Sequence, residues 1–196
     1  MRRLLTCVLL SVLALPLTAR ADGSIQLVAR AGVAKSFGDI GNGQQLSDSV
    51  SWAFPLEAQL AFRIAKQLAL GAYGRYAPTV AASACAGCTI DDVGFGALAE
   101  YRFSEKLEGG PWLGFSAGYE QLKTSAGGGG SGTVTGFEGA VSTGADFEVG
   151  GLTLGPYVQL SLGQFGKSTS GGESRSIASK GMHAFFAAGV RIALLL

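Results

Sequence analysis

Two cysteines three positions apart, Cys85 and Cys88, could serve redox, haem, zinc or disulfide chemistry. A redox-active pair is expected within a thioredoxin-like βαβ pattern, which the surrounding sequence does not show. Covalent haem attachment requires a His directly after the second cysteine, and Thr89 stands there. A four-ligand zinc site lacks its other ligands, because the single His of the chain is His183, in a distant segment. We therefore expect a structural disulfide, which an exported chain can form.

A second set of reactive side chains consists of six carboxylates and five arginines on alternating segments of the chain. A β-strand turns alternate residues to the same face, so each strand would carry its charges on one face. Enclosed charges are costly unless they are paired, and arginine binds carboxylate in a forked geometry. We therefore expect a salt-bridged interior; a water-filled path for protons or ions is the alternative, and catalysis by a carboxylate pair has the weakest support. The expected network comprises Arg30, Glu57, Arg63, Arg75, Glu100, Arg102, Glu120, Glu138, Asp146, Glu148 and Arg191.

No nucleophile forms a recognisable catalytic pair with His183, the only histidine. We expect His183 to be a polar filler at the rim of a β-barrel. Gly166-Lys167-Ser168 matches the end of a phosphate-binding loop, but Ser161 stands where that motif requires its first glycine. We therefore expect a protein that is not an enzyme, with no catalytic residue, no cofactor and no metal site.

The elements that position these residues are eight segments in which apolar and polar residues alternate. The segment 51–64 is the clearest, because apolar residues occupy every second position from Trp52 to Ile64. A period of two indicates β-strands with one apolar face, and a helical pattern does not fit. We expect strands at 24–34, 51–64, 68–77, 92–103, 112–121, 133–149, 152–164 and 182–196.

The connections between these segments are alternately long and short, and they cover 35–50, 65–67, 78–91, 104–111, 122–132, 150–151 and 165–181. Short turns at one end and longer loops at the other are typical of a transmembrane β-barrel. Aromatic residues near both ends of the apolar faces would anchor such a barrel at the two membrane interfaces. Near the loops they are Trp52, Phe54, Tyr76 and Tyr119, and near the turns they are Phe62, Phe103, Trp112 and Phe147.

The first 21 residues have the pattern of a secretory signal peptide. Two arginines precede an apolar stretch at 4–17, and Ala19-Arg20-Ala21 supplies an A-x-A cleavage site. We expect cleavage after Ala21 and a mature barrel domain over residues 22–196. Loss of three arginines with the signal leaves 12 basic and 14 acidic side chains, so we expect no nucleic-acid partner.

These features resemble the small bacterial outer-membrane β-barrel families, namely the OmpA-type transmembrane domain and the OmpX- and OmpW-like proteins. The resemblance rests on the signal peptide, the eight strands, the loop lengths and the alternating apolar residues of 184–196. Those barrels usually end in Phe or Tyr, whereas this chain ends in Leu196. The resemblance implies an all-β, eight-stranded antiparallel up-and-down transmembrane barrel in the bacterial outer membrane. Some such barrels are enzymes with a His-x-Ser pair, and His183-Ala184-Phe185 lacks that serine.

We therefore predict an integral outer-membrane barrel with a structural or adhesive role and variable outer loops as its contact surface. Its expected partners are outer-membrane lipid, the barrel-assembly machinery that reads the C-terminal strand, and extracellular contacts of the loops; we expect a monomer. A narrow channel for small solutes or ions is one alternative. A soluble, secreted, lipocalin-like barrel that binds a ligand is the other, and it would place its apolar face inside.

Overall fold

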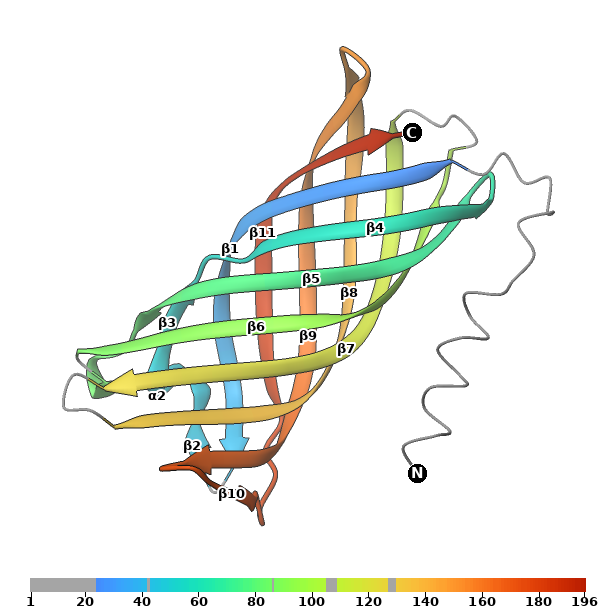
Figure 1. Cartoon of the computed structure of the whole chain (residues 1–196). Helices are drawn as coiled ribbons and strands as arrows, with labels where there is room; N and C mark the ends of the chain where they lie inside the picture. The colour runs from blue at the N-terminus through green and yellow to red at the C-terminus, as the bar shows by residue number, and fades with distance from the viewer. Residues whose placement is uncertain (1–23, 42, 86, 105–108, 127–129) are drawn as a thin grey trace, which may run out of the picture.

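The computed structural model describes residues 24–41, 43–85, 87–104, 109–126 and 130–196, and the expected signal peptide lies outside them. Eight long antiparallel segments close into a barrel (Figure 1). The ring consists of β1 (Ile25–Gly41), β3 (Val50–Ala53) with β4 (Leu56–Ala65), β5 (Leu68–Ala81), β6 (Cys88–Arg102), β7 (Gly110–Ala126), β8 (Ser131–Val149), β9 (Leu152–Ser170) and β11 (His183–Leu195).

Closure comes from the pairing of the last strand with the first, which runs from Gln26 opposite Leu195 to Gly38 opposite His183. Every other strand pairs with its neighbours in chain order. A closed ladder leaves no unpaired backbone edge, which is the condition for a sheet to stand in lipid. The predicted eight-stranded up-and-down barrel is confirmed. Among the described helices, none has the length and apolar character that a membrane crossing requires.

The strands extend further towards the loops than the sequence pattern predicted. Residues 35–41, 122–126 and 165–170 were expected in loops, and they continue β1, β7 and β9. Each extension has a partner: Cys88 lies opposite Ala126, and Gly132 lies opposite Ser170. Backbone hydrogen bonding between neighbouring strands therefore continues where side-chain alternation has already faded.

One predicted strand is interrupted. The segment 51–64 divides into β3 and β4 at Phe54 and Pro55. Proline has no backbone N–H and cannot donate a hydrogen bond to the ladder, so it favours a break in a sheet. The Pro55 carbonyl oxygen still accepts a hydrogen bond from the Gly32 amide at 3.1 Å, which holds the break against β1.

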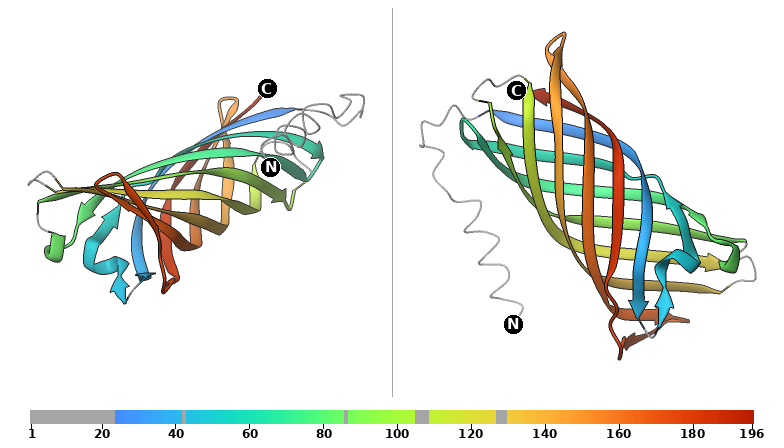
Figure 2. Two further views of the ribbon diagram at one scale, coloured as in Figure 1. Left: turned by 60° about the horizontal axis from the view of Figure 1, so that its bottom comes forward. Right: turned by 180° about the vertical axis from the view of Figure 1, so that it is seen from behind.

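Small elements close the loop end of the barrel. Between β1 and β3 lie β2 (Gln44–Gln45) and the short helix α2 (Leu46–Ser49); η1 (Ser83–Cys85) precedes β6. β10 (Glu173–Ser176) folds back on β9 as a hairpin at the same end (Figure 2). Cys85 and Cys88 form the expected disulfide there, with Cα atoms 5.4 Å apart.

The turn end is tighter, as the β8–β9 connection illustrates. Gly150 and Gly151 join the two strands, with φ of 61° and 83°. A two-residue hairpin with positive φ at both positions matches the twist of its strands, and glycine adopts it without strain. The turn therefore fixes the register of the two longest strands.

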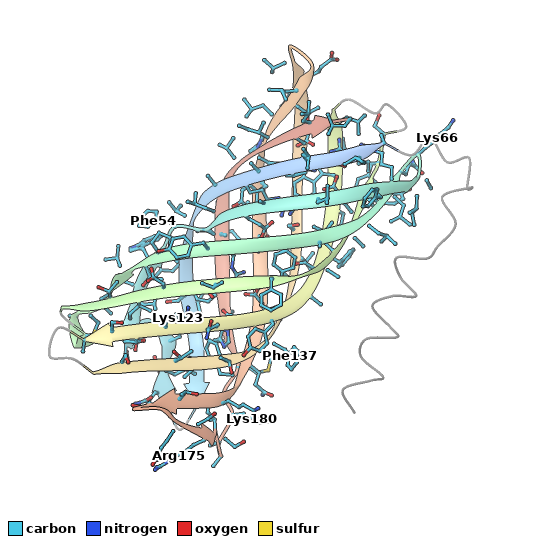
Figure 3. All side chains as sticks on the ribbon, in the orientation of Figure 1. Phe54, Lys66, Lys123, Phe137, Arg175 and Lys180 are labelled. Atoms are coloured by element: carbon cyan, nitrogen blue, oxygen red, sulfur yellow. A yellow bond between two sulfur atoms is a disulfide. The ribbon has the colours of Figure 1, made fainter. Side chains whose placement is uncertain are left out.

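The two faces of the wall differ sharply in polarity. The neighbours Leu60 and Gln59 illustrate this: Leu60 is 45% exposed on the outside, and Gln59 is 7% exposed inside. The outer surface carries apolar and aromatic side chains such as Phe54 and Phe137, whereas Lys66 lies at the turn end and Lys180 at the loop end (Figure 3). A lipocalin-like barrel would need the opposite arrangement, so that alternative is wrong.

Candidate functional site

The interior of the barrel holds a turn-side cluster of Glu100, Arg102, Asp146 and Arg191. Asp146 Oδ2 accepts hydrogen bonds from Arg102 Nη2 at 2.9 Å and from Arg191 Nη1 at 3.0 Å. Glu100 accepts from Arg102 Nε at 3.1 Å and from Arg191 Nη2 at 2.8 Å. Each carboxylate therefore bridges both guanidiniums. All four side chains are buried, so their charges are compensated by each other and not by water.

Trp112 lies beside this cluster and joins it to the middle of the interior. Its Nε1 donates to Asp146 Oδ1 at 3.1 Å. The guanidinium carbons of Arg191 and Arg30 lie 4.4 and 4.8 Å from the indole centroid, within cation–π range. Arg30 also pairs with Glu57 at 3.4 Å. The expectation that Trp112 belongs to a membrane girdle is wrong, because the side chain is fully buried inside.

A loop-side cluster consists of Arg75, Asp92, Glu120, Glu138 and His183. Arg75 contacts Glu138 Oε1 at 2.7 Å, Asp92 Oδ2 at 2.9 Å and Glu120 Oε1 at 3.7 Å. His183 Nε2 lies 2.7 Å from Glu120 Oε2. Three carboxylates therefore surround one guanidinium and one imidazole, which makes this cluster acidic, whereas the turn-side cluster has equal numbers of acids and arginines.

Above the loop-side cluster, an apolar lid fills the loop end of the barrel. It comprises Leu46 from α2, Val50 from β3, Ile90 from β6, Phe165 from β9 and Ile177, which follows β10. Each is at most 7% exposed. The lid reaches down to the charged cluster, because the Phe165 ring stacks on the His183 ring with centroids 4.2 Å apart. His183 is thus buried under the lid, not at the rim as expected.

The structure brings most of the predicted charged residues together. Nine of the eleven are buried in the interior, and Glu57 is half-buried beside them. Arg63 lies at the turn side, where its Nη1 donates to the Lys66 carbonyl oxygen at 3.1 Å. Glu148 has the predicted inward register but is exposed, because β8 ends one residue later and the wall no longer encloses it.

The sequence interpretation missed Asp92, His183 and Trp112 as members of the interior network. The alternation of residues along the strands would have identified two of them. Asp92 is an even number of residues from Glu100 on β6, and Trp112 is an even number of residues from Glu120 on β7, so each pair shares a face. His183 shares its register with Arg191, but its burial depends on the lid. Alternation along a strand therefore identifies whether a residue faces inwards, whereas the loop residues determine how deeply it is buried.

Small residues opposite the large ones make this packing possible. A Cβ atom at Gly163 would lie 2.5 Å from His183 Nε2 and 2.9 Å from Glu120 Oε2. We expect Gly163→Ala to destabilise the barrel by about 1–3 kcal/mol, because the buried pair would have to move apart. Gly166→Ala on the same strand is the control, since a Cβ there meets nothing within 4 Å. Urea unfolding from lipid vesicles measures both; equal effects of the two variants would contradict this account.

The arrangement is suited to holding the barrel closed. In the described part of the chain, no group of three or more His, Cys, Asp or Glu side chains is placed to hold a metal ion. The nearest approach to a catalytic pair is His183 with Glu120, whose side chains are 1% and 0% exposed. A substrate would have to displace the lid to reach them.

Comparison with known proteins supports the architecture. No family model matches the chain, and no curated protein sequence matches it. The fold is similar to the crystal structure of Neisserial surface protein A, with a TM-score of 0.56 and 17% identity over 87% of this chain and 96% of that one. It is also similar to the solid-state NMR structure of the outer membrane protein AlkL in lipid bilayers, with a TM-score of 0.53 and 14% identity over 89% of this chain and 90% of that one.

The structural similarity establishes a shared fold, and the outer surface of the barrel indicates the environment in which it lies. Large apolar side chains cover the outside of every long strand, with Leu60 on β4, Phe115 on β7 and Val158 on β9 all more than 40% exposed. Exposure of so continuous an apolar surface to water is unfavourable, whereas contact with lipid requires such a surface. The chain therefore has the fold and the apolar outer surface of the small integral β-barrels of the bacterial outer membrane.

Proposed function

We propose that this protein is a closed, non-enzymatic structural barrel that holds a contact surface on the outside of the bacterial cell. The observation that carries the proposal is the double closure of the interior, by paired charges along its length and by the apolar lid at its loop end. An eight-stranded barrel is just wide enough to be filled by its own side chains. The interior of this chain uses that space for paired arginines and carboxylates.

Two cavities that the described residues form beside the charged clusters are too small for a continuous water path. The cavity lined by Arg75, Asp92, Ser161 and Phe185 has a volume of about 20 Å³. That volume accommodates about one water molecule. A recess of about 90 Å³ lies at the turn side, lined by Arg63, Arg102 and other residues. Neither provides a passage for a hydrated ion, which favours the structural role over the channel.

The protein is expected to show negligible ion conductance when purified and inserted into planar lipid bilayers. The physical reason is that an ion would have to break the Arg–carboxylate contacts and displace the lid. A general porin inserted into the same bilayer serves as the control for detection. A steady, ion-selective conductance from this protein would overturn the closed-barrel proposal and favour the narrow channel.

The contact surface would be formed by the strand extensions and the elements beyond them. The β9–β10 hairpin projects at the loop end and carries an exposed pair, Arg175 with Glu173 at 2.7 Å. Neisserial surface protein A is described by its name as a surface protein, and we propose the same placement for this chain. We further propose that the barrel acts as a monomer and that β11 is the strand read by the barrel-assembly machinery.

A further inference from the structure

The lipid-facing wall contains a groove of about 700 Å³ that the closed interior does not explain. It crosses β11, β1, β4, β5 and β6, beside the break between β3 and β4. The strands β4 to β6 run side by side across the barrel in Figure 1. The inward-facing residues Arg30, Glu57 and Arg75 lie at its floor. Its rim consists of outward-facing side chains such as Leu56, Tyr76 and Phe95, so the groove opens to the membrane.

The strand register explains why the wall is hollow at this point. Ala29, Ala58 and Gly74 lie opposite one another on β1, β4 and β5. Their row continues to Ile192 on β11 and Phe95 on β6, two large side chains that form the borders. A Cβ atom added at Gly74 would meet nothing within 4 Å. Three small residues between two large ones therefore leave a space that neighbouring side chains do not fill.

A positive charge lies beyond the loop side of this groove. Lys35 is four residues from Ala31, a lining residue on the same strand, which corresponds to about 13 Å along β1. Its Nζ donates to the Ser51 carbonyl oxygen at 2.9 Å and lies 5.1 Å from the Trp52 ring centroid. No carboxylate of the described residues pairs with Lys35. A lysine beside an exposed tryptophan is typical of the interface where lipid head groups lie.

We propose that this groove binds one acyl chain of an anionic lipid of the outer leaflet, with its head group at Lys35. The apolar lining of the groove suits the acyl chain, and the Lys35 ammonium suits the anionic head group. The distance between Lys35 and the groove matches the depth of a lipid tail below its head group. A second copy of the protein fits less well, because a symmetric contact would place groove against groove and leave a void. The proposal is independent of whether the lumen conducts ions.

Native mass spectrometry of the full barrel, released from neutral detergent micelles, tests this with phosphatidylglycerol and phosphatidylcholine as probes. The unmodified protein should retain one lipid and prefer phosphatidylglycerol by about fivefold, the contribution of one lysine near an anionic head group. Ala58→Phe should fill the groove and reduce retention of both lipids by at least about tenfold, since several methylene contacts are lost. The Lys35→Gln variant should still retain one lipid but should no longer prefer phosphatidylglycerol over phosphatidylcholine.

Ala117→Phe is the matched control, because Ala117 faces outwards on β7 and does not line the groove, so its substitution should leave retention unchanged. The slower migration of boiled protein on a gel confirms that each variant is folded. Equal retention by Ala58→Phe and Ala117→Phe would overturn the proposal. A dimer that Ala58→Phe abolishes would also overturn it, and would assign the groove to a second copy of the chain.

Discussion

Replacing Asp146 by leucine is expected to lower the free energy of unfolding by about 3–5 kcal/mol, as the removal of one partner from a buried ion pair does. Asp146 accepts hydrogen bonds from Arg102, Arg191 and Trp112. Its loss would leave two buried guanidiniums with Glu100 as their shared carboxylate. Urea-induced unfolding from phospholipid vesicles, followed by tryptophan fluorescence, measures the change.

The same strand supplies a control. Glu148 has the same register as Asp146 but is exposed at the turn end, so Glu148→Leu should change the free energy by no more than about 0.5 kcal/mol. Adding Arg102→Met to Asp146→Leu should recover part of the lost free energy of unfolding, because it removes one of the two buried guanidiniums that Asp146 had compensated. If Asp146→Leu and Glu148→Leu cost the same, the turn-side cluster does not stabilise the barrel.

Placing a charge on the lipid-facing wall should have the second large effect. Val158→Arg is expected to destabilise the barrel by about 2–4 kcal/mol, the cost of an arginine near the bilayer midplane. Val158 is 41% exposed and lies six residues after Leu152, where β9 leaves the turn, which is roughly halfway across an apolar band about 25 Å tall. The same vesicle-based unfolding experiment gives the value.

Val149→Arg is the matched comparison for depth, because Val149 is also exposed on the outer face but ends β8 at the turn. An arginine there can reach the interface, and the expected cost is about 0–1 kcal/mol. A cost at Val149 equal to or greater than that at Val158 would show that the apolar belt lies closer to the turn end of the barrel.

Much of this architecture was predictable because a strand records its two faces in alternate residues. The apolar series from Leu56 to Ile64 and the inward positions of Glu100 and Arg102 follow directly from that period. The disulfide between Cys85 and Cys88 was predicted from the absence of other partners in the sequence. These features depend on local pattern and on composition, which a single sequence contains.

The parts that were not predictable depend on contacts between distant segments. The burial of His183 requires Phe165 to stack on it and Ile177 to return over the lumen. The length of β9 beyond Gln164 depends on the backbone partners that β8 supplies. Such contacts join residues whose side chains carry no periodic signal, and so the sequence pattern marked this region only as loop.

The lid also limits how this protein can diverge. Outer loops of a surface protein usually accept substitutions and insertions freely, since they contact only solvent. Here Leu46 and Ile177 come from loop segments yet fill the lumen, so their replacement would act as a core substitution. Freedom to accept substitutions is left to exposed positions such as Ser174 and Ser176 on β10. Changes that alter recognition from outside should accumulate there, between anchored residues that hold each loop in place.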